Sequence, residues 1–166
     1  KDLIEQNLSI IEIFKIFESN KMILLFLLEE KIITINETIY FEIINQSKLK
    51  RNKCCNFLYP ELKKFIGEEK VTNIEKELLS EDPDIFHNFD EKRSKGENES
   101  YISSLIRQDL IKEFIIYVNQ HNISLSETKI HDSTFETNQF LIGKTHSLIE
   151  YSAFFGSLQI FQYLRI

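Results

Sequence analysis

Residues that interrupt helices are scarce in this chain. Its 166 residues include only four glycines and two prolines, which disfavours a sheet rich in tight turns and favours helical runs. Tryptophan is absent, so a hydrophobic core has to be built from phenylalanine, isoleucine and leucine. The apolar run from Met22 to Leu28 ends at two glutamates and is far shorter than the roughly twenty residues that a membrane span requires. We therefore expect an all-α protein that is not inserted in a membrane.

The chain also lacks a disulfide framework and a basic surface. Its two cysteines, Cys54 and Cys55, are adjacent, and such a pair rarely closes a structural disulfide. This favours a reducing compartment, and we expect an intracellular, cytoplasmic protein. The formal net charge is −6, and most of the excess acid lies in the first hundred residues. Nucleic acid is therefore not expected as a partner, because its phosphates are bound through lysine and arginine.

Motifs that carry known catalytic chemistry are missing as well. Four isolated glycines cannot form a phosphate-binding loop, and the sequence contains neither G-x-S-x-G nor H-E-x-x-H. None of the four histidines shares a helix face with a cysteine or an acid at the spacing of metal ligands. Carboxylate pairs are numerous, but each is better explained as a solvated helix face or a helix cap. We expect no catalytic, cofactor-binding or metal site, and a protein that is not an enzyme.

The last twenty residues have the pattern of two short helices joined by a turn. Ser147 and Glu150 have the S-x-x-E spacing of a capping box, which predicts that a helix begins there. Gly156 lies where this helix would end, since glycine adopts a positive φ without a steric penalty. The apolar faces of the two helices are expected at Ile149, Ser152 and Ala153 and at Ile160, Phe161 and Leu164.

These positions resemble one ankyrin repeat, whose pattern is T-P-L-H-x-A-A-x-x-G followed by E-[IV]-V-x-x-L. Ser147 stands for the threonine, Ala153 for the second alanine and Gly156 for the glycine. Leu148 and Glu150 depart from the proline and the histidine, but the capping box can replace the cap that threonine and histidine form. An ordinary helical hairpin of a bundle would carry the same apolar spacing and stays the alternative.

A second hairpin is expected upstream, with one helix from Tyr101 to Gln108 and another from Leu110 to Gln120. Its turn would lie at Asp109, which is 47 residues before Gly156, whereas the ankyrin period is about 33 residues. The excess falls in a polar stretch at about residues 121–146. We expect a long inserted loop there, with an extended segment or a short hairpin.

The best internal boundary is the charged stretch from Glu91 to Ser100, which contains no apolar residue. Before it, Asp82, Pro83 and Asp84 have the order of a helix start, with aspartate as N-cap and proline in the first turn. We expect a helical N-terminal domain over residues 1–99 and degenerate ankyrin-like repeats over residues 100–166. The expected fold is all-α, with stacked antiparallel helical hairpins in a solenoid-like arrangement.

Several segments together are similar to a family of divergent ankyrin-repeat proteins that is expanded in parasitic protists. The similar segments are Asp82–Asn98, Ile106–Asp109, Glu113–Ile115, Phe135–Asn138 and Leu148–Ser157. Proteins of that family carry a helical N-terminal domain of unknown function before their repeats. The resemblance implies a fold and an interaction role but no characterised biochemical activity. It also implies that the repeat array continues beyond Ile166, so that the face from Ile160 to Ile166 would lack a neighbour.

The resemblance also places a binding surface, because ankyrin-type proteins bind with the tips of their hairpins and the inner face of each first helix. By position, Phe154 and Phe155 lie on that face, and two adjacent exposed aromatic rings would make a binding hot spot. Either ring could instead belong to the core. The remaining candidates are Lys144 and His146 at the tip, and Arg107 and Gln108 in the upstream hairpin.

A non-enzymatic module for protein–protein interaction is therefore the expected function, with another protein as partner. In the alternative, the helical first hundred residues are a structural cap of a longer ankyrin solenoid. Stacked repeats need a polar end to stay in solution, and such a cap would have no binding role of its own.

Overall fold

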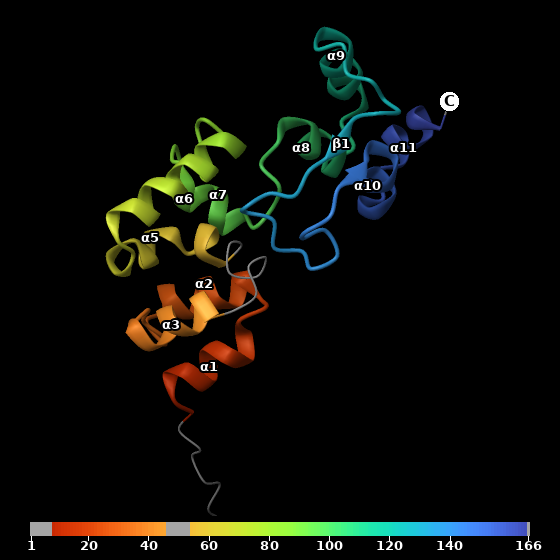
Figure 1. Cartoon of the computed structure of the whole chain (residues 1–166). Coiled ribbons are helices and arrows are strands. Elements are labelled where there is room, and N and C mark those ends of the chain that lie inside the picture. Colours follow the sequence, from red (N-terminus) through yellow and green to blue (C-terminus); the bar gives the residue numbers. More distant parts are fainter. Residues whose placement is uncertain (1–7, 46–53, 166) are drawn as a thin grey trace, which may run out of the picture. The chain divides into compact units, whose positions relative to one another are not determined.

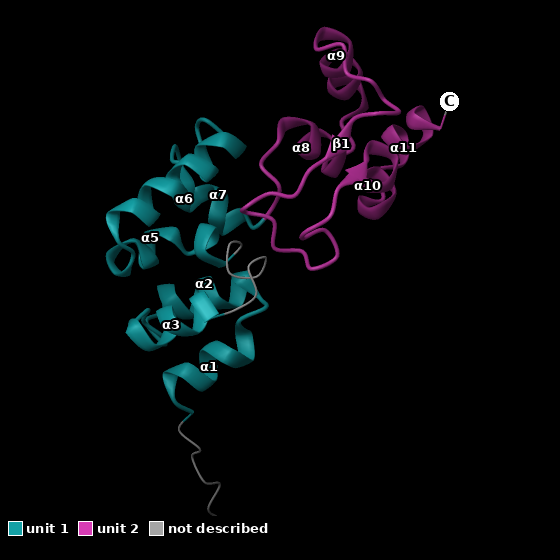
Figure 2. Cartoon of the chain, in the orientation of Figure 1, with its two compact units in different colours: residues 1–96 teal, residues 97–166 magenta. Residues whose placement is uncertain are grey.

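The computed structural model describes residues 8–45 and 54–165 of the chain (Figure 1). Helices predominate in the described part, which confirms the expected all-α class. The chain divides into two compact units, residues 1–96 and residues 97–166 (Figure 2). The boundary expected from the sequence lay after residue 99, and the ankyrin-like nature of the second unit stays a prediction.

Unit 1 is built from helices, and the first of them pack around an apolar core. Its elements are α1 (Ile10–Phe17), α2 (Lys21–Glu29), α3 (Glu37–Asn45), α5 (Tyr59–Leu62), the 3-10 helix η1 (Lys63–Phe65), α6 (Glu68–Glu81) and α7 (Phe89–Lys95), and residues 54–57 are also helical. Helix α1 packs against α2 and α3. The fully buried Phe14, Ile39 and Phe57 belong to the core that these helices enclose. Ile39 and Ile43 are one helical turn apart, so both lie on the buried face of α3.

Two helix starts in unit 1 differ in detail from the sequence prediction. The apolar residues from Leu3 to Phe17 have helical spacing and predict one helix there. Helix α1 begins within that range, at a capping box of Ser9 and Glu12, and residues 1–7 lie outside the described ones.

Thr34 and Glu37 also have the spacing of a capping box, which predicts that a helix begins there. This box does not start α3; instead the side chain of Asn36 accepts from the Ile39 N–H at 3.0 Å. Asparagine accepts this bond as well as threonine does.

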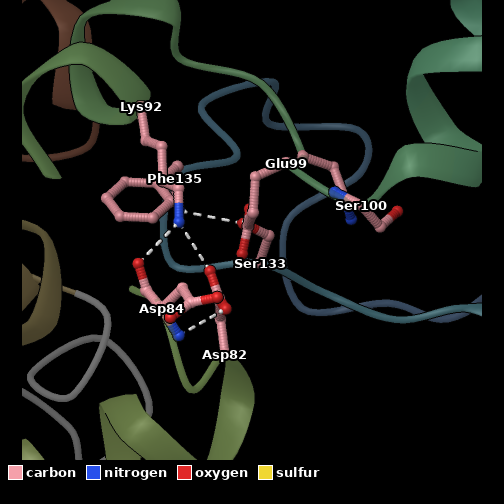
Figure 3. Close-up of polar contacts among 8 residues, drawn as sticks. Asp82, Asp84, Lys92, Glu99, Ser100, Ser133 and Phe135 are labelled. Atoms are coloured by element: carbon pink, nitrogen blue, oxygen red, sulfur yellow. Dashed lines mark hydrogen bonds and ion pairs between the residues drawn. The ribbon is translucent and has the colours of Figure 1, made fainter. Parts of the chain in front are cut away.

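Asp82 ends α6 instead of beginning a helix, and this expectation was wrong. Residues 83–88 form turns, and α7 begins after Asn88, which has a φ of 59°. The Asp82 carboxylate accepts from the Asp84 N–H at 2.9 Å and from Lys92 Nζ at 2.6 Å (Figure 3). Aspartate before proline suits such a turn as well as an N-cap, since in both its side chain binds a nearby backbone N–H.

Unit 2 contains two helical hairpins. They are formed by α8 (Tyr101–Arg107) with α9 (Ile111–Gln120) and by α10 (Leu148–Phe155) with α11 (Leu158–Leu164). Each helix packs against its hairpin partner, and in addition α10 packs against α8 and α11 against α9 (Figure 1). The core between them includes Ile106, Phe114, Leu148, Tyr151 and Ile160. Ile160 is fully buried, as expected for the apolar face of its helix, but this contradicts the expectation that the face from Ile160 to Ile166 lacks a neighbour at its start. Ile166, the other end of that face, lies outside the described residues.

The turns of the two hairpins have the same backbone geometry. Asp109 and Gly156 adopt positive φ angles of 52° and 69°. Asp109 and Gly156 donate their N–H groups to the carbonyls of Ile106 and Ala153, three residues earlier. The next residues, Leu110 and Ser157, donate to the carbonyls of Leu105 and Ser152, five residues earlier. The pattern closes a helix end with a left-handed residue, which aspartate tolerates better than most residues do.

The long connection between the hairpins is held at its base by two short strands. Strand β1 (Lys129–Ile130) pairs antiparallel with β2 (His146–Ser147), which agrees with the expected extended segment in residues 121–146. Within the connection Phe135 is fully buried. The Asn98 side chain donates to the His131 carbonyl at 2.8 Å, and the Ser133 hydroxyl donates to Glu99 (Figure 3). Side chains from the start of unit 2 therefore fix the loop in place.

Candidate protein-binding surface

The buried face of α10 differs from the one expected. Leu148, Tyr151 and Ser152 are buried, whereas Ala153 is exposed and Ile149 is half-buried. Leu148, Tyr151, Ser152 and the half-buried Phe155 follow the spacing i, i+3, i+4, i+7, which is one face of a helix. The ankyrin alignment therefore placed the core of this helix one residue away from its observed position.

Tyr151 connects α10 to the upstream hairpin. Its side chain is 1% exposed, and its hydroxyl accepts a hydrogen bond from Arg107 Nη1 at 3.1 Å. Arg107 also forms an ion pair with Glu97, with Nε 3.0 Å from the carboxylate. Burial raises the pKa of Tyr151, and the nearby guanidinium acts in the opposite direction. Arg107 therefore holds the two hairpins together in addition to lying near the surface.

The two phenylalanines at the end of α10 have different environments. Phe155 is half-buried and packs against the core, with its ring centroid 4.8 Å from that of Tyr151. Phe154 is 44% exposed, and its ring meets that of Phe155 edge-on at 5.0 Å. Edge-to-face pairs of this kind are favourable beyond their buried area. The exposed ring is therefore supported by a second ring that the core holds in place.

The other sequence candidates do not join this ring cluster. Gln108 is the exposed C-cap of α8, and Lys144 is exposed in the loop before β2. His146 is half-buried in β2, and its Nε2 is a buried nitrogen without a hydrogen-bond partner among the described residues. Three of the six candidates thus belong to one chain of contacts. Arg107 and Phe155 both contact Tyr151, and Phe154 contacts Phe155.

Two buried residues of unit 2, Tyr151 and Glu136, were not among the residues predicted from the sequence. Tyr151 and Phe155 are one helical turn apart, and this i, i+4 aromatic spacing could have identified the link. Glu136 is 4% exposed in the inserted loop, where its carboxylate accepts from the Asn138 N–H at 2.8 Å. Burial raises the pKa of Glu136 above its ordinary value. Hydrogen bonds from backbone N–H groups act in the opposite direction and limit this rise. A buried glutamate in a polar loop leaves no signal in the sequence.

Two further findings bear on other classes of function. Among the described residues, no three histidine, cysteine, aspartate or glutamate side chains gather so that they could hold a metal ion. No helix in the described ranges is long and apolar enough to cross a membrane. In comparisons with protein-family models, curated proteins and solved structures, the chain shows no match.

Proposed function

We propose that this chain is a non-enzymatic protein-binding module of ankyrin-repeat type, and that unit 2 contacts its partner with the end of α10. The observation that carries the proposal is Phe154, whose ring is exposed and packs edge-on against Phe155, which in turn packs against Tyr151. Interface hot spots are enriched in aromatic residues that lie in such well-packed settings. A ring that is already ordered also loses little conformational entropy when a partner binds.

The neighbours of Phe154 favour close approach of a partner. Ala153, the preceding residue, is also exposed and has a small side chain. Glu150 lies one helical turn before Phe154 and is exposed, although its carboxylate already accepts from the Ser147 N–H at 2.8 Å. The surface is thus an apolar centre with a charged edge, which is the usual arrangement at protein interfaces.

The proposal is tested by removing the ring of Phe154. Phe154→Ala is expected to weaken partner binding at least tenfold, because truncation of a hot-spot residue commonly has an effect of about 2 kcal/mol or more. Phe140→Ala is the matched control, since Phe140 is 72% exposed in the inserted loop of the same unit. Affinity capture from native extract, followed by titration of the captured protein in purified form, measures the difference.

A partner that binds the unmodified chain and Phe140→Ala equally, but not Phe154→Ala, supports the proposal. Equal binding by both variants would overturn the role of Phe154 and would favour the structural capping role instead. Phe155→Ala is unsuitable as a probe of binding alone, because Phe155 packs against the core. We further propose that this interaction takes place in the cytoplasm, because the two cysteines are adjacent in the sequence and such a pair rarely closes a structural disulfide.

A further inference from the structure

Three aromatic rings meet on the surface of the upstream hairpin of unit 2. Tyr101, at the start of α8, is 55% exposed, and its ring centroid lies 5.0 Å from that of Tyr117 on α9, with the two planes at 73°. The Tyr117 ring lies in turn 4.4 Å from the ring of His121, the exposed C-cap of α9. Tyr117 is half-buried and packs against the core of the unit. The cluster therefore combines a ring that is open to solvent with one that packs on the core.

A carboxylate belongs to the same side of α9. Glu113 lies four residues before Tyr117, so the two side chains share one face of the helix. Glu113 is exposed, and among the described residues no lysine or arginine forms an ion pair with it. Within the same ranges the cations that stand over aromatic rings use other rings, those of Phe57, Tyr59, Phe65, Phe89 and Phe161. This face thus presents a carboxylate and aromatic rings without a cation from the described chain.

In unit 1 an arginine completes the same set of groups. The guanidinium carbon of Arg93 lies 6.0 and 5.8 Å from the ring centroids of Phe57 and Phe89. Its Nη1 donates to the Glu61 carboxylate at 2.9 and 2.8 Å. A guanidinium suits such partners, because its planar face stacks on aromatic rings while its edge donates to a carboxylate. A lysine ammonium is more strongly hydrated and has no plane to stack. The formal net charge of −6 also attracts basic partners to this chain.

We propose that this surface of α8 and α9 binds an arginine side chain of a partner protein. The guanidinium packs against the rings of Tyr101 and Tyr117, and its N–H groups donate to the Glu113 carboxylate. Arginine is among the residues enriched at interface hot spots, where a ring and a carboxylate together provide both of its preferred contacts. The surface lies on α8 and α9 and does not involve Phe154 of α10, so this proposal and the role of Phe154 can fail separately.

The test is a titration of the isotope-labelled full chain with Nα-acetylarginine amide, followed by the shifts of backbone amide signals. The signals of Tyr101, Glu113 and Tyr117 are expected to move together along one saturating curve. Nα-acetylcitrulline amide has the same length and a planar end but no charge, and it is expected to bind about tenfold more weakly. Nα-acetyllysine amide keeps the charge without the plane and is expected to bind about threefold more weakly. Absence of saturable shifts at these residues at tens of millimolar, or equal binding of the arginine and citrulline compounds, would overturn the proposal.

Matched variants identify the surface, and because Tyr101 and Glu113 are exposed, none of them removes a core residue. Glu113→Gln is expected to weaken binding of the arginine compound about fivefold. Glu127→Gln is its control, since Glu127 is an exposed carboxylate in the turn after α9, and it should bind as the unmodified chain does. Tyr101→Leu should also weaken binding, whereas Tyr101→Phe keeps the ring and should not. Unchanged binding by Glu113→Gln, or an equal loss with Glu127→Gln, would show attraction by the overall charge alone and would overturn the proposal.

Discussion

In each unit a charged side chain joins segments that are distant in the sequence, and these two side chains, Arg93 and Asp109, use different partners. In unit 1, Arg93 of α7 is 6% exposed and places Nη1 2.8 Å from the Glu61 carboxylate of α5. In unit 2, the Asp109 carboxylate accepts from the N–H groups of Gln159 and Ile160, in the first turn of α11, at 3.1 and 3.0 Å. The buried cation thus binds the Glu61 side chain and the Phe57 carbonyl, whereas the anion binds backbone N–H donors.

The difference lies in what each group leaves behind when it is removed. The guanidinium of Arg93 lies over the rings of Phe57 and Phe89, with its carbon 6.0 and 5.8 Å from their centroids. Its removal leaves a carboxylate without its cation and an empty space between two rings. The N–H groups at the start of α11 have no partner within their own helix, so Asp109 satisfies donors that would otherwise turn to water. We therefore expect the link in unit 1 to be the stronger one.

The largest effect is expected for Arg93→Ala. Breaking a buried ion pair typically destabilises a protein by 3–5 kcal/mol, and because the Glu61 side chain remains 25% exposed, we expect about 3 kcal/mol. The two units have separate apolar cores. Amide hydrogen exchange should therefore accelerate at Ile39 and Phe57 in unit 1 while protection persists at Phe114 in unit 2.

The control for this prediction is Lys95→Ala. Lys95 pairs with Glu91 at 2.7 Å on the surface of the same helix, and both side chains are more than half exposed. Exposed pairs of this kind contribute little to stability, so exchange rates should not change. Equal effects of the two variants would mean that burial does not distinguish the two ion pairs.

A smaller effect is expected for Asp109→Ala in unit 2. The variant loses the cap of α11, worth about 1 kcal/mol, and places alanine at a φ of 52°, which adds roughly 1 kcal/mol of backbone strain. Urea denaturation should show the free energy of unfolding reduced by about 2 kcal/mol.

Two further substitutions of Asp109 separate these contributions. Asp109→Gly relieves the backbone strain but still lacks the cap, so it should lose about half as much stability as Asp109→Ala. Asp109→Asn keeps an accepting oxygen and tolerates positive φ, so it should be the mildest of the three. The reverse order would show that Asp109 does not stabilise unit 2 through these hydrogen bonds.

The features that the sequence predicted correctly are those set by residues close together in the chain. The capping box of Ser147 and Glu150 forms as expected, with the Ser147 N–H 2.8 Å from the Glu150 carboxylate. The helices of both hairpins in unit 2 also begin and end within a residue or two of the expected positions. Short-range spacing determines such features, because the partners of each hydrogen bond lie within one helical turn.

The features that were not predicted from the sequence depend on contacts between distant residues. Arg93 belongs to a charged stretch that we expected to be solvated, yet it is buried through partners 32 and 36 residues before it. The buried face of α10 is set by its packing against α8 and α11, which the repeat pattern alone does not contain. Asp82 shows a third limit, since the same residue types start helices and form turns.

The smallest effect is expected at the turn of Asp82, where a charged pair is only partly buried. The side chains of Asp82 and Lys92 are each about a quarter exposed. Burial raises the pKa of Asp82, but Lys92 and the Asp84 N–H together outweigh it, and the pKa is lowered below its ordinary value of 3.8. A carboxyl with a lowered pKa stabilises the folded state above its unfolded pKa, and this contribution disappears as the pH falls through the folded pKa.

Asp82→Asn should therefore be less stable than the unmodified chain at pH 7, by less than about 1 kcal/mol after screening by solvent. The difference should shrink as the pH is lowered below about 4, because protonation then removes the same charge from the unmodified chain. Urea denaturation of both proteins between pH 3 and 7 measures this. A difference that stays constant over that range would show that the asparagine acts through the Asp84 turn and not through the pair with Lys92. The partly exposed pair would then contribute even less than the comparison with Arg93 implies.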